Sequence, residues 1–281
     1  MKKYTTSIFI HQQMTNALFK DEFITEKVYR SSSDYSATDI KTEIKYNGFT
    51  LWDQKFNPNT RPKPPTPALK LGSMLHKAVL EPNEFNSFYQ VIENKRTKEG
   101  KAKILELEEK GIEAISFEEK ILCNDICDAV ANHPIASELF ANGAPEQSFF
   151  WDHKETNLPL KCRADWINGD TIIDLKTTSE GGAHEDTFSR AVANFLYHIQ
   201  AAHYCEGIGL KKFVFVAVEK VYPFNIGVYE LDEETIQEGL QVQKESLKRI
   251  KSYVKSGIWP GYNKPNEGIK TISIPYWAFK K

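Results

Sequence analysis

The chain has 281 residues, with 36 Lys and Arg against 38 Asp and Glu, so its formal net charge is −2. This balance excludes a protein that coats nucleic acid over its whole surface, but it leaves room for a local basic channel. A hydrophobic share of 41% is enough for an ordinary core, and no stretch approaches the roughly 20 apolar residues that cross a bilayer, so we expect no membrane partner.

The four cysteines lack the dense spacing of a secreted disulfide framework, and no apolar leader opens the sequence. We therefore expect a reduced, cytoplasmic protein. Cys123 and Cys127 are four residues apart, so core packing and metal binding both fit them. Because Cys162 and Cys205 offer no matching second pair, packing is favoured.

The first 60 residues mix short apolar patches with polar runs, and we interpret residues 1–60 as an extension that packs on a domain formed by residues 61–281. Prolines between positions 61 and 67 impose an extended chain. A helix follows, with Thr66 as N-cap and His76 on its apolar face, and it ends at Glu81-Pro82.

Residues 94–119 form a charged stretch in which basic residues precede alternating acids. A solvated surface and a contact with a DNA backbone both fit this stretch. The last part of it leads into a predicted helix over residues 116–133.

Strand patterns dominate from residue 147 onward. We predict strands at 148–153, 160–167 and 171–176, a helix at 187–205, strands at 212–218 and 226–231, and a helix at 233–254. This order predicts an α/β fold in which a mixed central sheet is flanked by helices.

The tetrapeptide 167–170, Ile-Asn-Gly-Asp, predicts a tight hairpin, because Asn-Gly tolerates the positive φ angles of a two-residue turn. If its first and last residues pair, Asp165 lies opposite Ile172, and Asp174 is its diagonal neighbour on the same face. Lys176, two residues further, points to that face as well. The hairpin therefore predicts three ionisable groups in one place.

Two adjacent carboxylates repel each other, and burying both is costly unless a cation or a proton compensates. Mg²⁺, with Mn²⁺ as a substitute, fits two aspartates plus the backbone carbonyl of Leu175. Such a metal would bind a phosphate and activate a water, and Lys176 would position or deprotonate that water or stabilise developing charge. An ordinary ion pair of Lys176 with Asp174 or Asp165 on a solvated sheet is the alternative.

Four short elements in a fixed order resemble the signature of the PD-(D/E)XK nucleases. They are Gly72-Ser73-Met74-Leu75-His76, Arg163-Ala164-Asp165-Trp166, Asp174-Leu175-Lys176-Thr177-Thr178 and Gln200-Ala201-Ala202-His203-Tyr204. The similarity is greatest to the RecB-like branch, and within it to the phage and prophage RecE (exonuclease VIII) type. Ala164 stands where the pattern has proline, and Asp174 where glutamate is commoner, but neither change removes a metal-binding oxygen.

The resemblance implies a restriction-endonuclease-like core with three side-chain metal ligands and one catalytic lysine. The ligands are His76, Asp165 and Asp174, and the lysine is Lys176. Gln200 and Tyr204 would lie beside the site, and Gln200 would hydrogen-bond the substrate phosphate or a metal-bound water.

Each supporting residue also has a purely structural interpretation. A lone histidine on an apolar helix face, such as His76, is usually a core residue. Gln200 and Tyr204, four residues apart, are either substrate-binding residues or part of a helix–sheet contact. Arg163 contacts phosphate or pairs with an acid. Glu146 is either a further acid at the centre or an exposed residue at a strand edge.

The same resemblance implies a 5′→3′ exonuclease that acts on linear double-stranded DNA and leaves 3′ single-stranded overhangs for recombination. It further implies a homo-oligomeric ring at DNA ends, a single-strand annealing recombinase as partner, and a phage or prophage protein in a bacterial cytoplasm. The alternatives are a structure-specific or restriction-like endonuclease, and a non-catalytic DNA-binding module with the same fold. The intact Asp165, Asp174 and Lys176 count against the module.

Overall fold

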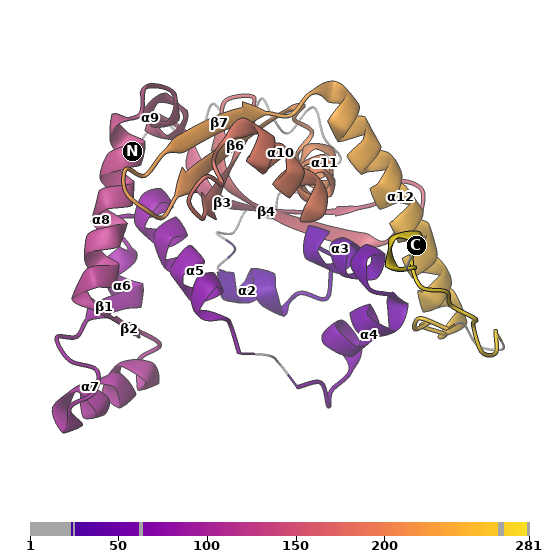
Figure 1. Cartoon of the computed structure of the whole chain (residues 1–281), viewed down its shortest axis with the longest axis horizontal. Helices are drawn as coiled ribbons and strands as arrows, with labels where there is room; N and C mark the ends of the chain where they lie inside the picture. Colours follow the sequence, from indigo (N-terminus) through magenta and orange to yellow (C-terminus); the bar gives the residue numbers. More distant parts are fainter. Residues whose placement is uncertain (1–23, 25, 62–63, 264–266, 280–281) are drawn as a thin grey trace.

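The structure is a computed structural model, and it describes residues 24, 26–61, 64–263 and 267–279 (Figure 1). The helices are α2 (Glu26–Ser31), α3 (Ala37–Lys45), α4 (Gly48–Phe56), α5 (Pro67–Leu80), α6 (Phe85–Phe88), α7 (Lys98–Glu109), α8 (Phe117–Asn132), α9 (Pro134–Ala141), α10 (Glu185–Asn194), α11 (Tyr197–Ile208) and α12 (Glu233–Ser256), with a 3-10 turn η1 (Tyr276–Ala278). The strands are β1 (Tyr89–Val91), β2 (Glu113–Ile115), β3 (Ala144–Asp152), β4 (Pro159–Asn168), β5 (Thr171–Thr178), β6 (Lys212–Glu219) and β7 (Ile226–Glu230).

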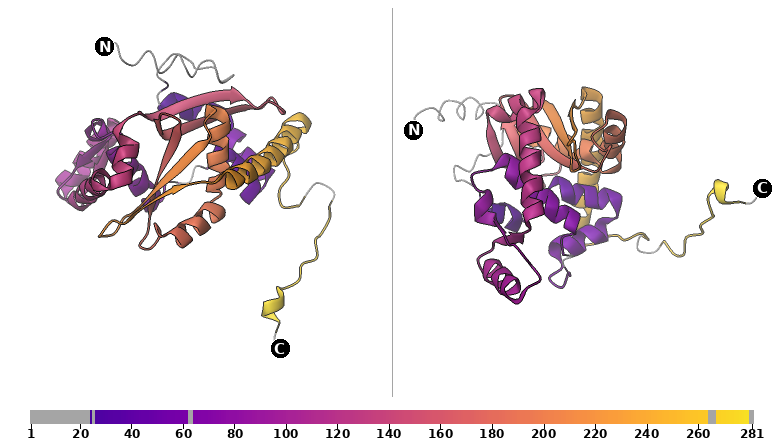
Figure 2. Two further views of the ribbon diagram at one scale, coloured as in Figure 1. Left: turned by 90° about the horizontal axis from the view of Figure 1, so that it is seen from above. Right: turned by 60° about the vertical axis from the view of Figure 1, so that its left-hand side comes forward.

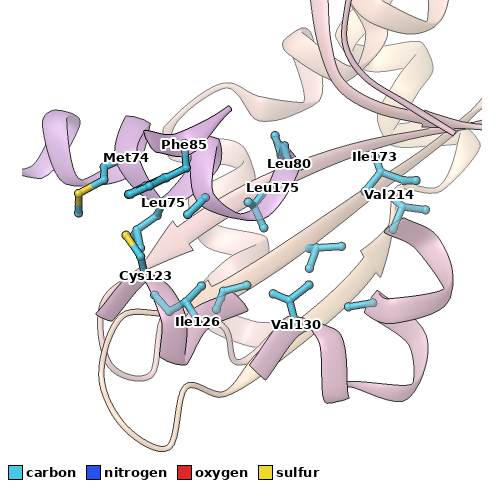
Figure 3. Packing of buried hydrophobic residues seen from close by; sticks show 14 of the residues in the cluster. Met74, Leu75, Leu80, Phe85, Cys123, Ile126, Val130, Ile173, Leu175 and Val214 are labelled. Atoms are coloured by element: carbon cyan, nitrogen blue, oxygen red, sulfur yellow. The ribbon is translucent and has the colours of Figure 1, made fainter. Parts of the chain in front are cut away.

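The central sheet has the order β3-β4-β5-β6-β7, and only the β5–β6 pair is parallel. Side chains alternate between its two faces. Ile173 and Leu175 pack with α5 and α8 on one face (Figure 3), whereas Ile172 packs with α10 and α11 on the other. The predicted α/β fold with a mixed sheet between helices is confirmed. Among the described residues, no helix is long and apolar enough to cross a membrane.

Most predicted elements lie within a few residues of their expected bounds, but the predicted helix over 187–205 is wrong. Leu196 has φ 55°, a left-handed conformation that an α-helix cannot continue, so the segment divides into α10 and α11. Leu196 packs against the cluster formed by Ile40, Ile199 and neighbouring residues. Helical periodicity runs through this break, and therefore the sequence pattern does not reveal it.

The charged stretch 94–119 contains α7, and a two-stranded parallel sheet of β1 and β2 flanks that helix (Figure 1). Several of its charges pair with one another, for example Lys103 with Glu106 at 2.9 Å and Lys95 with Glu119 at 3.1 Å. These ion pairs fit a solvated surface, and a contact with DNA stays a prediction. Cys123 is buried in the core and Cys127 packs against it, and all four cysteines are unpaired.

The described part of residues 1–60 contacts β4, α11 and α12. Tyr35 lies along the open side of β4, where its N–H donates to the Pro159 carbonyl at 2.8 Å and its carbonyl accepts from the Lys161 N–H at 2.9 Å. Ile40 and Leu51 are fully buried in the cluster shared with α11 and α12. A domain boundary at residue 60 stays a prediction, and residues 1–23 lie outside the described part of the chain.

Gly239 lies where α12 crosses α11 closely. A Cβ at this position would be 2.4 Å from the His198 carbonyl oxygen and 2.8 Å from the Cβ of Ala202. We expect Gly239→Ala to lower the free energy of unfolding by about 1–3 kcal/mol, because overpacking forces the two backbones apart. Urea denaturation measures this loss.

Gly72→Ala in α5 is the matched control. Its Cβ would meet only Thr177 Oγ1, at 3.8 Å, so alanine's higher helix propensity is expected to dominate and to stabilise the chain by about 0.5–1 kcal/mol. Equal effects of the two substitutions would contradict the close packing of α11 on α12.

Candidate active site

The candidate site lies where β4 and β5 part. The two strands pair from Asn168↔Thr171 to Trp166↔Ile173, and the ladder then stops. Beyond this point β4 continues along β3 and β5 continues along β6. By this register Asp165 and Asp174 face each other across the opening.

The predicted register of this hairpin is wrong by two residues. The turn residues are Gly169 and Asp170, because Asn168 pairs with Thr171. Gly169 has φ 58°, while Asp170 does not have a positive φ, which matches a type II′ turn with glycine first. The prediction assumed a type I′ turn, which needs positive φ at both positions. A shift of two preserves which side chains share a face, and Asp165 moves from opposite Ile172 to opposite Asp174.

The alternation of side chains along β4 is interrupted next to Asp165. Ala164 and Ile167 both pack on the α11 side of the sheet, whereas Trp166 packs on the α5 side. The Asp165 carboxylate lies in the opening between the strands, where its Oδ2 accepts a hydrogen bond of 2.9 Å from the Leu175 N–H. The acids therefore converge because the strands part.

The pKa values of Asp165 and Lys176 are both raised by their surroundings. Burial, and then the negative charge of Asp174, raise the pKa of Asp165 well above its usual range. Burial acts to lower the pKa of Lys176, but Asp174 and Asp165 outweigh it and the pKa is raised. The Lys176 ammonium contacts the buried Asp174 carboxylate directly. Lys176 thus contacts Asp174, and its charge also acts to lower the pKa of Asp165.

His76 reaches the site from α5. Its Nδ1 lies 3.5 Å from Asp165 Oδ2. Burial, together with the positive charge of Lys176, lowers the pKa of His76 to about 4. The imidazole is therefore neutral near pH 7, which is the form that binds metals.

Gln200 reaches the centre from α11. Its Nε2 donates to Asp174 Oδ1 at 2.6 Å, and its Oε1 accepts from the Nζ of Lys41 at 3.3 Å. Tyr204, one turn further, lines a cavity of about 560 Å³ together with Gln200, and its ring packs edge-on against Phe213. The structure thus brings Gln200 into the acid cluster and leaves Tyr204 on an adjoining wall.

Glu146 lies opposite Asp165 in the β3–β4 register, with φ 53°. Its Oε2 accepts a hydrogen bond of 2.5 Å from the Nε of Arg163, and the Nη1 of Arg163 donates to Ser148 Oγ at 2.8 Å. Burial raises the pKa of Glu146, although Arg163 acts to lower it. Of the two alternatives for Arg163, the structure contains the ion pair with an acid. A phosphate contact by Arg163 stays a prediction.

Comparison with known families identifies the family of the chain. Residues 52–271 match the family described as "PDDEXK-like domain of unknown function (DUF3799)". The chain belongs to this PDDEXK-like family. No curated protein matches the sequence.

One solved structure has a similar fold. The chain is similar to the crystal structure of a "Putative exonuclease" from Eubacterium rectale, with a TM-score of 0.63, 17% identity, and coverage of 90% of this chain and 97% of that one. At this identity the likeness shows the fold alone. The chain also aligns with the crystal structure of SSO0001 over 78% of this chain and 77% of that one, at 16% identity and a TM-score of 0.34. This TM-score is too low to show a shared fold. Family and fold together support a nuclease.

The residues of the candidate site fit a hard divalent cation. Asp174 Oδ2 is buried without a hydrogen-bond donor of good geometry, and its contact is the Lys176 ammonium. Two carboxylates, one neutral imidazole and the Leu175 carbonyl form a donor set rich in oxygen, which suits Mg²⁺ or Mn²⁺. Among the described residues, no three His, Cys, Asp or Glu side chains are already gathered at ligand spacing. Asp174 is held by Lys176 and Gln200, while Asp165 contacts His76 and Leu175.

The sequence did not predict that Lys41 lies at the site. Lys41 comes from the segment before the family match and contacts Gln200. Burial, and then the charge of Lys176, lower its pKa to about 8. The two residues are separated by 159 positions, and no local pattern links them.

Proposed function

We propose that the chain is a metal-dependent deoxyribonuclease that hydrolyses phosphodiester bonds in DNA. The observation that carries this proposal is the meeting of Asp165, Asp174, Lys176 and His76 where β4 and β5 part, in a chain of the PDDEXK-like family. A structural ion pair alone would not need a second enclosed carboxylate and a neutral histidine beside it.

His76, Asp165, Asp174 and the Leu175 carbonyl would hold Mg²⁺, with Mn²⁺ as a substitute. When bound, the metal supplies positive charge to the scissile phosphate and makes an attacking water more acidic. Gln200 orients Asp174 through the 2.6 Å hydrogen bond from its amide. Leu175 orients Asp165 in the same way through its backbone N–H.

Lys176 is the residue proposed to act on the reacting groups. Its Nζ lies 4.9 Å from the centre of the Tyr197 ring and 5.8 Å from that of Phe215, which limits its movement to the neighbourhood of the acids. An ammonium offers three donors. It orients the attacking water and stabilises the negative charge that builds on the phosphate oxygens.

The finer proposal is a RecE-type exonuclease that degrades one strand of linear double-stranded DNA in the 5′→3′ direction and leaves 3′ overhangs for recombination. It is supported by the resemblance of the four sequence elements around His76, Asp165, Lys176 and Gln200. An endonuclease on the same fold and a non-catalytic DNA-binding module are the competing functions.

Linear and covalently closed circular duplexes, each with Mg²⁺ or EDTA, test the proposal. We expect Mg²⁺-dependent loss of the linear DNA alone, and release of a label from the 5′ end of the digested strand before its 3′ end. Cleavage of closed circles would replace the exonuclease by an endonuclease. Binding without cleavage in any divalent metal would favour the non-catalytic module.

We also propose that the chain forms a homo-oligomer, which the exposed residues of segment 267–279 support. Ile269, Ile272, Tyr276 and Trp277 are 100%, 90%, 88% and 84% exposed, and the segment projects away from the body (Figure 2). Exposed apolar surface of this kind marks interaction sites. A ring of subunits at a DNA end would cover it.

The triple variant Ile272→Ser, Tyr276→Ser, Trp277→Ser tests this surface without touching the core. We expect the native chain to form an oligomer and the variant to shift to monomer, because the contact loses its apolar area. Size-exclusion chromatography with light scattering measures both masses. A monomeric native chain, or equal masses for the two, would contradict the proposal.

The remaining proposals rest on the RecE resemblance. They are a single-strand annealing recombinase as partner, a phage or prophage origin, and a location in the bacterial cytoplasm. The four unpaired cysteines support a reducing compartment.

A further inference from the structure

Lys41 is a second lysine at the candidate site. It belongs to α3, which precedes the family match over residues 52–271. Its Nζ lies 5.6 Å from the centre of the Tyr197 ring, and the Nζ of Lys176 lies 4.9 Å from the same centre. The two lysines therefore contact one aromatic ring from α11. Gln200 connects them further, since it accepts from Lys41 and donates to Asp174.

The charge of Lys41 is not matched by an acid. Lys176 contacts the Asp174 carboxylate, whereas Lys41 has the neutral amide oxygen of Gln200 and the face of Tyr197. Within the described ranges, no carboxylate forms an ion pair with Lys41. The nearby acid is Asp174, and its oxygens already contact Lys176 and Gln200. The Lys41 ammonium is therefore available to bind a further anion supplied from outside the chain.

Lys41 is held in place by the opposite side of its helix. Glu43 is buried, and both of its oxygens accept from Arg249 of α12, at 2.8 and 2.7 Å. Ser246 donates to the same carboxylate at 2.8 Å. A capping box of Ser36 and Asp39 fixes the start of the helix. The helix is therefore anchored to α12 with the lysine directed at Gln200.

We propose that Lys41 binds a non-bridging oxygen of a DNA phosphate beside Lys176. This inference rests on the proposed nuclease function and names a phosphate-binding residue that lies outside the family match. Lysine binds phosphate as a point charge with three donors, and such charge-assisted hydrogen bonds are about twice as strong as neutral ones. The N-terminal segment thereby takes part in substrate binding in addition to covering β4.

The test is Lys41→Gln, with Lys45→Gln as the matched control one turn further along the same helix. Lys45 is exposed and its Nζ lies 5.8 Å from the centre of the Phe195 ring, away from Gln200. Binding of a short labelled duplex is measured in EDTA over a series of salt concentrations. We expect Lys41→Gln to reduce the slope of log K against log salt by about 1, as for one lost phosphate contact. With Mg²⁺, we expect its kcat/KM to fall by about 10- to 100-fold.

The outcomes separate the two proposals. A native chain that binds DNA but never cleaves it would overturn the nuclease, while the salt slope would still report on Lys41. Unchanged slope and kcat/KM in Lys41→Gln, or equal losses in Lys45→Gln, would overturn the phosphate contact. Lys41→Met, which keeps the apolar stem, replaces Lys41→Gln if the latter does not fold. Lys41→Arg is expected to restore the slope, because it restores the charge.

Discussion

Asp174→Asn is expected to reduce DNA cleavage by at least about 10³-fold, because it removes a charged oxygen from the proposed metal site. An amide offers no net charge to a divalent cation, and the Lys176 ammonium loses the carboxylate that it contacts. The amide of Gln200 also loses a charged acceptor. The measurements are the release of acid-soluble nucleotides and the rise in Tm on addition of Mn²⁺. Both are expected to disappear, since a ligand stabilises only the state that binds it.

Asp170→Asn is the control for this prediction. Asp170 lies in the turn of the same hairpin, where its exposed carboxylate accepts from the hydroxyl of Thr171 at 3.0 Å. We expect this variant to cleave DNA at the native rate and to keep the full Mn²⁺ response. Native cleavage by a folded Asp174→Asn protein would show that the acid does not belong to the active centre.

Lys176→Met is expected to lower cleavage by about 10²- to 10⁴-fold while metal binding persists. The variant lacks the ammonium that orients the water and stabilises charge on the phosphate. It also frees the Asp174 carboxylate from its contact with Lys176, so Mn²⁺ is expected to raise Tm at least as much as in the native chain. This separation of chemistry from metal binding distinguishes Lys176→Met from Asp174→Asn.

Lys212→Met on the neighbouring strand β6 is the matched control. Lys212 forms an exposed ion pair with Glu230 at 3.8 Å, and such surface pairs contribute little. We expect native cleavage from this variant. If Lys176→Met instead lost the Mn²⁺ response together with cleavage, Lys176 would be required to hold the site together rather than to act on the substrate.

The sequence predicted the elements of the site better than their geometry. Thr66 as N-cap placed His76 on α5, and the hairpin signal placed Asp165 and Asp174 on adjoining strands. The predicted register of the hairpin was wrong because the turn can start at Asn168 or at Gly169. Of the two turn residues observed, Gly169 and Asp170, only Gly169 has a positive φ. The parting of β4 and β5 depends on their separate partners, β3 and β6. Local sequence patterns carry no information on that choice.

The N-terminal residues of the site were beyond prediction for a related reason. Lys41 and Glu43 belong to a short helix whose position depends on contacts with Gln200 and Arg249, far away in the sequence. Periodicity and capping describe a helix but not the surface on which it packs. The same limit explains Leu196, where packing of a partly buried side chain against the cluster of Ile199 accompanies a left-handed backbone that no local pattern indicates.

Digestion of linear duplex DNA by the native chain and by Asp174→Asn, each with Mg²⁺, Mn²⁺ or EDTA, tests the central claim most directly. Metal-dependent release of nucleotides by the native chain, absent in EDTA and absent in the folded variant, is the predicted result. Equal release by the two proteins, or release that persists in EDTA, would contradict a metal-dependent nuclease centred on Asp174.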